Sequence, residues 1–382
     1  MSLRLLHTSD WHIGKTIRGQ SRADEHRAVL SEVGQIAREQ EVDLVLVAGD
    51  IFETAAPSPE SEQIAWDALL DLVDAAGRVV VIAGNHDNPR RLDALRELML
   101  RGDIHVVAEP RRPDEGGLVE LEVNGMKVDV VALPFVSRRG IVRADELMSG
   151  AAFEHAGSYA DRVRSLISVL SQNSKADAQI LMAHALVMGG GAGGGERPAH
   201  LADEYAVPAQ AFPMTASYVA LGHLHMAQKI PGPSPIHYSG SLLQLDFGDT
   251  DSAKSVSIVD IEPDAPAVVR RVNLAAGRRL RTIVGTLDEL RSTVVGDEWL
   301  RVTVKEARRV DLAEQVRTIF GDRCVDVLVE GPETTENRAQ AVRSGRSPSE
   351  LFDDYLADLG IEDPRLVALF AELHAHVVGD TT

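Results

Sequence analysis

The amino-acid sequence predicts an α/β fold of two packed β-sheets flanked by helices, followed by a small α+β domain and a helical tail. In the first part of the chain, short apolar runs alternate with segments of helical periodicity, which is typical of strand–helix repeats. From about Val119 onward, most apolar runs follow one another without a helix between them. A second sheet packed on the first is the simplest interpretation.

The first sheet is expected to contain strands at 4–7, 43–48 and 78–83, with helices at 22–40, 59–75 and 91–100. The first of these helices has one apolar face, which includes Val29, Val33 and Ile36. The second sheet is expected to contain strands at 121–123, 127–133, 180–184, 218–221, 236–239 and 255–260. The glycine-rich run from Gly189 to Gly195 is expected to form a mobile loop.

The chain has 382 residues, and a single core usually stops growing near ~250–300 residues. We therefore expect a large domain at 1–275, a small α+β domain at 276–335, and a linker with a pair of helices at 336–382. Each tail helix carries an apolar stripe, formed by Leu351, Tyr355, Leu356 and Leu359 in the first helix and by Leu366, Leu369, Phe370, Leu373 and Val377 in the second.

Composition restricts the class of protein. The formal net charge is −19, which argues against a nucleic-acid binder, although bound metal ions or a partner subunit could supply positive charge. The single cysteine, Cys324, excludes an intrachain disulfide and is typical of a reducing compartment. The apolar runs are shorter than the ~20 residues that span a bilayer, and the N-terminus does not resemble a signal peptide. These observations predict a cytoplasmic protein without a membrane segment.

Five polar motifs each follow an apolar run. They are Asp10-x-His12, Gly49-Asp50, Gly84-Asn85-His86-Asp87, His184, and Gly222-His223-Leu224-His225. The carboxyl ends of parallel strands meet at one edge of a sheet, so these motifs are expected to lie together. Residues two apart in an extended backbone point the same way, so we expect Asp10 and His12 to reach one metal ion, and His223 and His225 to face the same site.

The residue types predict a centre of two metal ions. A carboxylate such as Asp50 can bridge two cations, Asn85 offers a neutral oxygen ligand, and mixed oxygen and imidazole ligands suit manganese, iron or zinc. Two metal ions about 3.5–4 Å apart activate water and stabilise the oxygens of an in-line displacement at phosphorus. His86 is placed to protonate the leaving oxygen, and Asp87 to orient His86.

Less specific interpretations apply to each motif alone. An Asp-x-His pair or a single histidine after a strand is usually structural, and the metal prediction depends on all five motifs occurring in order. The remaining histidines are interpreted as surface or core residues: His7, His26, His105, His155, His200, His237, His374 and His376. Gly14-Lys15-Thr16 resembles the end of a phosphate loop, but Ser9 stands where that loop needs glycine. We therefore expect this chain to bind no ATP.

The motifs resemble those of the calcineurin-like metallophosphoesterases and, among them, the nuclease subunits of bacterial SbcCD double-strand-break repair complexes. The resemblance covers nearly the whole chain and is weakest over 262–340. The matching stretches are residues 6–14, with Thr8-Ser9-Asp10-Trp11-His12, then Gly49-Asp50-Ile51-Phe52, residues 220–225, Tyr238-Ser239-Gly240-Ser241, and residues 347–352.

The resemblance implies a two-sheet metallophosphoesterase sandwich with a capping domain that guides DNA. It assigns Asp10, His12 and His225 to one metal ion, Asn85, His184 and His223 to the other, and Asp50 to both. The family uses manganese, although magnesium, iron or zinc are alternatives here. It cuts DNA from ends, opens hairpins, and forms homodimers with an SbcC-like coiled-coil ATPase, which residues 347–378 would bind. The helices that follow residues 57 and 90 are the expected dimer contacts.

Glu53 departs from part of this family, because archaeal and eukaryotic relatives have histidine near that position. Bacterial members commonly have an acidic residue there, and Glu53 is left outside the expected site. Two other functions are possible on the same scaffold. The acidic charge favours a phosphoesterase for small molecules or proteins, and the apolar tail is compatible with a non-catalytic scaffold. Arg90 and Arg91 are either DNA contacts or solvated residues at a helix start.

Overall fold

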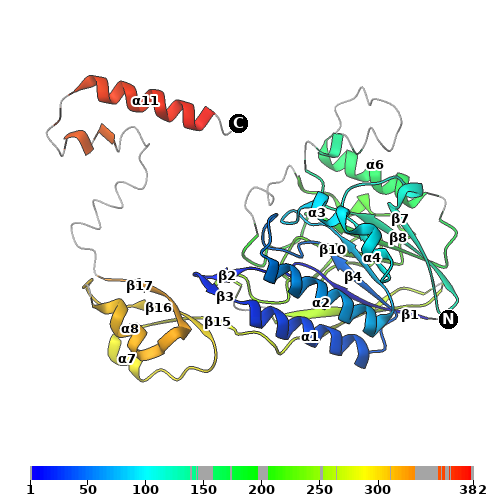
Figure 1. Cartoon of the computed structure of the whole chain (residues 1–382), viewed down its shortest axis with the longest axis horizontal. Coiled ribbons are helices and arrows are strands. Elements are labelled where there is room, and N and C mark those ends of the chain that lie inside the picture. The colour runs from blue at the N-terminus through cyan, green and yellow to red at the C-terminus, as the bar shows by residue number, and fades with distance from the viewer. Residues whose placement is uncertain are drawn as a thin grey trace. The chain divides into compact units, whose positions relative to one another are not determined.

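The structure is a computed structural model (Figure 1). It describes residues 2–137, 140–142, 144, 158–172, 174–196, 205–249, 253–263, 265–309, 311–331, 352–353, 355–357, 361 and 363–379. The chain forms two compact units. The first comprises Met1–Ile283, Val294–Arg301 and Phe320–Asp326, and the second comprises Val284–Thr293, Val302–Ile319 and Val327–Thr382.

One six-stranded sheet of the first unit has the order β14-β13-β1-β4-β5-β6. Its parallel strands are β1 (Leu3–Thr8), β4 (Leu44–Ala48), β5 (Val79–Ile82) and β6 (Ile104–Val107). β13 (Ser255–Ile261) pairs antiparallel with β1, and β14 (Val268–Asn273) pairs antiparallel with β13. Strands β4 and β5 are buried along their whole length, as expected for a sheet that is covered on both faces.

The other six-stranded sheet has the order β11-β12-β10-β9-β8-β7. Its parallel strands are β8 (Met126–Leu133), β9 (Ala178–His184), β10 (Tyr218–Gly222) and β12 (Ile236–Tyr238). The antiparallel edge strands are β7 (Leu118–Val123) and β11 (Gln228–Ile230). Each sheet therefore contains four neighbouring parallel strands, whose carboxyl ends lie at the same end of that sheet.

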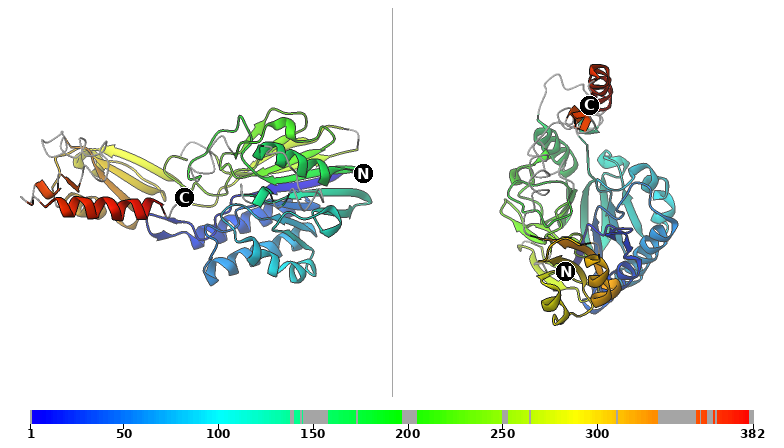
Figure 2. Two further views of the ribbon diagram at one scale, coloured as in Figure 1. Left: turned by 90° about the horizontal axis from the view of Figure 1, so that it is seen from above. Right: turned by 90° about the vertical axis from the view of Figure 1, so that its left-hand side faces the viewer.

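The two sheets pack face to face between helices. Alternate residues of both sheets, such as Leu46 and Met182, form the core between them. Helices α1 (Ala23–Glu39) and α2 (Pro59–Ala76) cover the outer face of the first sheet, and α6 (Tyr159–Ser171) covers that of the second. The end-on view in Figure 2 shows the two halves side by side. The predicted two-sheet sandwich flanked by helices is confirmed. The expectation that strand 255–260 belongs to the second sheet was wrong, because this segment pairs antiparallel with β1 and extends the first sheet as β13.

The remaining elements are short. A two-stranded ribbon is formed by β2 (Thr16–Ile17) and β3 (Gln20–Ser21), and 3-10 turns occupy Pro113–Glu115, Ala209–Ala211 and Gly321–Arg323. A three-stranded sheet has the order β15-β16-β17 and comprises β15 (Leu280–Gly285), β16 (Trp299–Val304) and β17 (Cys324–Val329). Helices α7 (Leu287–Arg291), α8 (Leu312–Phe320) and α11 (Pro364–Gly379) follow in the chain order of Figure 1. Within the described part of the chain, every helix is too short or too polar to span a bilayer.

The sequence prediction was wrong for the helix at 91–100. Two helices, α3 (Pro89–Ala94) and α4 (Arg96–Leu100), lie there instead, because the Leu95 amide donates to the Leu92 carbonyl in a tighter turn. Five strands were not predicted: the two-residue strands β2 and β3, and β6, β11 and β14. Two arginines, Arg270 and Arg271, interrupt the apolar pattern of β14. Helix α6 was also missed, although its sequence has a Ser158 capping box and an apolar face. The expected helix start at 347–350 lies outside the described residues.

Candidate metal centre

The candidate site lies at the carboxyl ends of β1, β4, β5, β9 and β10. The loop after β1 runs beside the loop after β4 because their backbones are hydrogen-bonded. The Asp10 amide donates to the Gly49 carbonyl at 2.9 Å, and the His12 amide donates to the Asp50 carbonyl at 3.0 Å. This pairing brings the side chains of Asp10, His12 and Asp50 to one place.

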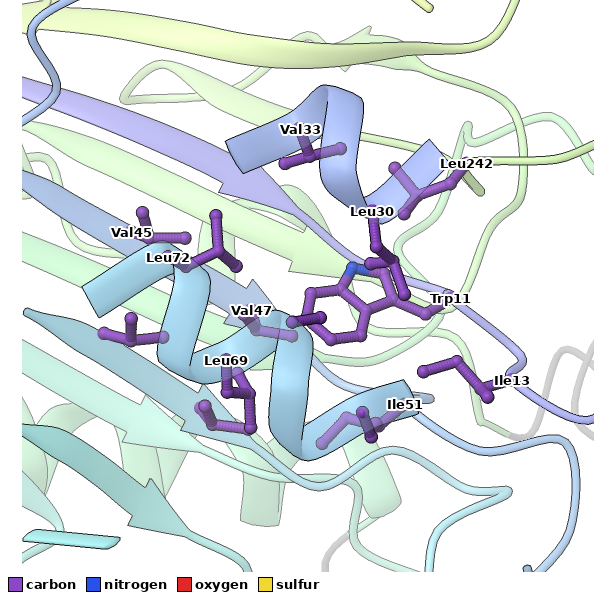
Figure 3. Packing of buried hydrophobic residues seen from close by; sticks show 14 of the residues in the cluster. Trp11, Ile13, Leu30, Val33, Val45, Val47, Ile51, Leu69, Leu72 and Leu242 are labelled. Carbon is purple, nitrogen blue, oxygen red and sulfur yellow. The ribbon is translucent and has the colours of Figure 1, made fainter. Parts of the chain in front are cut away.

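Trp11 anchors this loop in the core. Its indole is fully buried among side chains of α1, α2 and β4, such as Leu30, Leu69 and Val47 (Figure 3). The indole Nε1–H donates to the Thr8 hydroxyl at 2.9 Å. Because Trp11 is held on the helix side, its two sequence neighbours are left on the side of the site.

The extended backbone expected for Asp10-x-His12 is wrong. Asp10 and His12 have φ angles of 53° and 49°, and Asp50 has 52°. These are left-handed conformations that cost energy for residues with a Cβ and that cluster at functional sites. His223 also has a positive φ of 108°. The side chains therefore converge because the turns are left-handed, and not because of strand periodicity.

Two glycines allow the motifs to approach each other closely. A Cβ on Gly84 would collide with the carboxylate and the backbone of Asp50, and one on Gly222 would collide with the carbonyl of Ala48. Any larger residue at these positions would therefore push apart the strand ends that carry the site.

Asp10, His12 and His225 form one half of the cluster. Ligand-type atoms of all three lie within 4.8 Å of one another, and all three residues are buried. The Nε2 atoms of His12 and His225 are 3.1 Å apart. The main-chain amide of His223 donates to both oxygens of Asp10 and holds the carboxylate in place.

Asn85, His184 and His223 form the other half. The Asn85 side-chain oxygen lies 3.0 Å from His184 Nε2 and 2.9 Å from His223 Nδ1. Asp50 lies between the two halves, with Oδ2 at 3.7 Å from His12 Nε2 and 3.4 Å from His184 Nε2. The structure thus brings together all seven side chains that the sequence assigned to metal binding.

The histidine rings have the orientation that metal ligands need. The Nδ1–H groups of His12, His184 and His225 face the Glu53 carboxylate, the Ala48 carbonyl and the Gly194 carbonyl at 2.9, 2.8 and 2.7 Å. An acceptor at Nδ1 keeps the proton on that atom and leaves the Nε2 lone pair free for a metal ion. Two such lone pairs, on His12 and His225, point at each other.

The buried carboxylates also favour a bound cation. Burial raises the pKa of Asp10 to about 7, and the nearby Asp50 carboxylate adds to this shift. Burial acts in the same direction on Asp50, but charge interactions with His184, His12 and His86 hold its pKa well below the ordinary value. Two neighbouring buried carboxylates with several imidazole nitrogens form a donor set that a divalent cation neutralises, so the residues fit such an ion.

His86 and Asp87 differ in their surroundings. His86 Nδ1 lies 2.7 Å from the carbonyl oxygen of Glu53. The Asp87 carboxylate accepts from the amides of Ile51, Phe52 and Gly84. Asp87 therefore joins the β4 and β5 loops. That it also orients the His86 ring stays a prediction.

Two acidic residues around the site were not predicted. Glu53 contacts His12, as described above. The side chain of Glu196 is almost completely buried and accepts from the amides of Gly193, Gly194 and His225. The run expected to be a mobile loop is thus anchored against His225. The sequence contains one indication of this anchoring, which is the glutamate at the end of the glycine-rich run. No spacing rule links that glutamate to a histidine 29 residues later.

The other candidate residues agree with simpler interpretations. His7 and His26 are buried, and His105 and His237 are partly buried. His155 and His200, and the side chains of His374 and His376, lie outside the described residues. Arg91 pairs with Glu62, whereas Arg90 is exposed. The two interpretations of this arginine pair both remain predictions.

Comparison with known proteins agrees with this geometry. The family model described as calcineurin-like phosphoesterase matches residues 3–227. A relative from Bacillus subtilis (strain 168), named as the D subunit of the nuclease SbcCD, is 34% identical and aligned over 82% of this chain and 81% of its own. Proteins of the same name from Rhodobacter capsulatus and Escherichia coli (strain K12) are 32% and 28% identical, over 75% and 79% of this chain and 76% and 75% of theirs.

Two solved structures are similar at lower levels. A protein of Thermus thermophilus aligns with 72% of this chain and 99% of its own at 14% identity and a TM-score of 0.38. A dimetal phosphatase from Danio rerio aligns with 71% of this chain and 96% of its own at 13% identity and a TM-score of 0.43. The family model, which covers most strands of both sheets, is the stronger indication of the fold.

Proposed function

Because the chain belongs to the calcineurin-like phosphoesterases and, within them, to the family of nuclease subunits of SbcCD complexes, we propose that it is a metal-dependent DNA nuclease. It hydrolyses phosphodiester bonds at DNA ends as an exonuclease and at single-stranded regions such as hairpins as an endonuclease. It acts in double-strand-break repair and recombination.

We propose that Asp10, His12 and His225 hold one divalent cation, that Asn85, His184 and His223 hold the second, and that Asp50 is shared. The mixture of imidazole nitrogens with carboxylate and amide oxygens suits manganese, with magnesium, iron or zinc as alternatives. Two such cations, when bound, would supply Lewis acidity and an activated water at the phosphate.

His86 is the proposed general acid. Its Nδ1 lies 2.7 Å from the Glu53 carbonyl oxygen, and Nε2 is the ring atom that we propose delivers a proton to the leaving oxygen. Its ring lies edge-on to that of His12, with 4.7 Å between the ring centroids. His86 would therefore act beside the metal centre without being a ligand in it. Asp87 supports the loop from which His86 projects.

The position of Asp50 between the two histidine groups is the observation that carries this proposal. It is tested by calorimetric titration of the metal-free full-length protein with Mn²⁺, followed by measurement of nucleotides released from linear duplex DNA. We expect two bound Mn²⁺ ions and Mn²⁺-dependent release. A protein that leaves DNA intact with Mn²⁺, both alone and with an SbcC-like ATPase, would contradict the nuclease proposal.

The His86→Ala variant tests the division of roles. It should bind Mn²⁺ like the unsubstituted protein and lose at least about a hundredfold in cleavage rate, the usual effect of removing a general acid. His105→Ala, which changes a histidine in β6, is the matched control and should cut normally. Unchanged turnover in His86→Ala would remove His86 from the mechanism.

The proposed partners follow from family membership and from exposed apolar side chains. In the tail, Tyr355, Leu369 and Leu373 are more than half exposed, and residues 347–378 are proposed to bind the coiled coil of an SbcC-like ATPase. A pull-down with residues 340–382 deleted should fail to capture that ATPase. Domain 276–335 is proposed to guide DNA, and helices α2 to α4 to form a homodimer contact.

The alternative substrate is a smaller phosphodiester. The net charge of −19 favours it, because a long DNA molecule is repelled by an acidic surface. Hydrolysis of bis-(p-nitrophenyl) phosphate beside duplex DNA separates the two functions. Turnover of the small ester without any DNA cleavage would favour the alternative.

A further inference from the structure

Glu53 lies beside the candidate metal centre, and its residue type alone did not indicate this position. It follows Gly49-Asp50-Ile51-Phe52 at the end of β4, and its amide donates to the Ile13 carbonyl at 3.1 Å. This bond continues the pairing of the β1 and β4 loops. The side chain is 22% exposed, so it lies at the rim of the centre with its carboxylate partly shielded from water.

Three groups of the site contact Glu53. Its Oε2 lies 2.9 Å from His12 Nδ1, and its Oε1 lies 2.9 Å from Lys15 Nζ. Its carbonyl oxygen lies 2.7 Å from His86 Nδ1, whereas its Oε2 is farther from that nitrogen, at 3.9 Å and beyond hydrogen-bond distance. One residue therefore contacts a proposed metal ligand, a lysine and the proposed general acid.

The two carboxylate contacts have different physical effects. The contact with His12 fixes the Nδ1–H tautomer and turns Nε2 towards His225 and Asp50. A carboxylate at this place also makes the imidazole a stronger electron donor to a metal ion. Lys15 Nζ holds the other carboxylate oxygen.

We propose that Glu53 is a positioning residue of the metal centre: its carboxylate orients and strengthens His12 as a ligand, while its backbone carbonyl orients His86. This inference rests on the proposed function, since it assumes that His12 binds a metal ion. It gives the side chain and the main chain of Glu53 separate tasks. Substituting the side chain should therefore weaken metal binding and leave His86 in place.

An alternative is that Glu53 and Lys15 form a surface ion pair with only a structural effect. Such a pair contributes little to stability. Loss of a purely structural pair would change the melting temperature of the metal-free protein and would not selectively change metal affinity. The two interpretations therefore differ in the quantity that changes: the melting temperature of the metal-free protein for a structural ion pair, and the Mn²⁺ affinity for a positioning residue.

The test compares Glu53→Ala and Glu53→Gln in the full-length protein. In calorimetric titration of the metal-free protein with Mn²⁺, Glu53→Ala should raise the Kd of one site about 10–100-fold, as expected for losing the carboxylate partner of a ligating histidine. Glu53→Gln keeps an oxygen acceptor without the charge, so its Kd should lie between those of the unsubstituted protein and Glu53→Ala. At saturating Mn²⁺, kcat should recover to within a few-fold of the unsubstituted protein.

Glu39→Gln is the matched control. Glu39 is an exposed glutamate at the end of α1 whose side chain accepts from Gln35, and the substitution removes the same charge. It should leave both Kd and kcat unchanged. If Glu53→Ala does not fold, the nearly isosteric Glu53→Gln carries the test.

The outcomes separate this inference from the proposed function. Normal Mn²⁺ affinity in both Glu53 variants, in a protein that binds two Mn²⁺ ions and cuts DNA, would overturn the role of Glu53 alone. Weakened Mn²⁺ binding in a protein that does not cut DNA would support Glu53 and overturn the nuclease proposal. A kcat that stays low at saturating Mn²⁺ in both variants would also overturn the division between side chain and main chain.

Discussion

Replacing Trp11 by phenylalanine should destabilise the core and loosen the metal centre at the same time. The indole is fully buried and donates to the Thr8 hydroxyl, which is itself fully buried. Loss of the donor leaves that hydroxyl without this bond, at a cost of about 1–3 kcal/mol. The smaller ring leaves a void, which costs about 1 kcal/mol more.

Together these effects predict that Trp11→Phe lowers the free energy of unfolding by about 2–4 kcal/mol. A typical domain has about 5–15 kcal/mol of stability, so the variant should still fold. Trp11→Ala, at about 3–5 kcal/mol or more, would risk unfolding the unit. Phenylalanine is therefore the better substitution for measuring the metal centre.

The assay is urea unfolding of the metal-free protein, followed by circular dichroism, beside Mn²⁺ titration of the folded protein. Thr8→Val and the double variant complete a mutant cycle, and the coupling energy should be about 1 kcal/mol. The Mn²⁺ Kd should rise in Trp11→Phe, because Asp10 and His12 flank the anchored ring. A change in unfolding free energy below about 0.5 kcal/mol, with unaltered Kd, would refute this account of the Asp-x-His turn.

Three further predictions concern the surroundings of the site. Gly84→Ala should abolish binding of two Mn²⁺ ions in calorimetry, because its Cβ would displace Asp50, whereas the control Gly102→Ala has only an ordinary contact and should bind normally. Glu196→Ala should weaken Mn²⁺ binding, since the three amides that hold the loop beside a ligand lose their acceptor. Identical Mn²⁺ titration curves for this variant and the unsubstituted protein would show that the loop keeps its place without Glu196. Burial lowers the pKa of His26 to about 4, so the unfolded chain binds an extra proton between about pH 4 and 6.5. Unfolding free energy should decrease by up to about 3 kcal/mol as the pH is lowered through that window, and substituting His26 by glutamine should flatten the slope in urea melts.

The sequence was sufficient for most of the site because its chemistry is concentrated at strand ends. Asn85, His184 and His223 lie at the ends of apolar runs. Parallel strands bring their carboxyl ends together, and this does not depend on the conformation of the loops. The backbone conformation was not accessible in the same way. Aspartate and histidine enter the left-handed region more readily than most residues, but their types alone do not show that this turn forms. The turn arises from pairing with the β4 loop.

Positioning residues are harder to predict than ligands, because they are defined by contact and not by type. Glu53 and Glu196 are two among many acidic residues in this chain, and both act on rings that are distant in sequence. The strand β14 was missed for a related reason, because its arginines mask the apolar period on an edge strand.

The acidity of the chain and a phosphodiester substrate are compatible because the proposed ligands carry less negative charge than two divalent cations carry positive charge. Among the seven proposed ligands, only Asp10 and Asp50 carry a charge, and the others are imidazoles and an amide. Two divalent cations bring four positive charges against those two negative ones, so the occupied centre has an excess of positive charge where a phosphate binds. A ligand set made of carboxylates would cancel that excess. The imidazole-rich composition therefore provides local attraction for phosphate within a protein of net charge −19, and the overall charge governs only the approach of DNA from a distance.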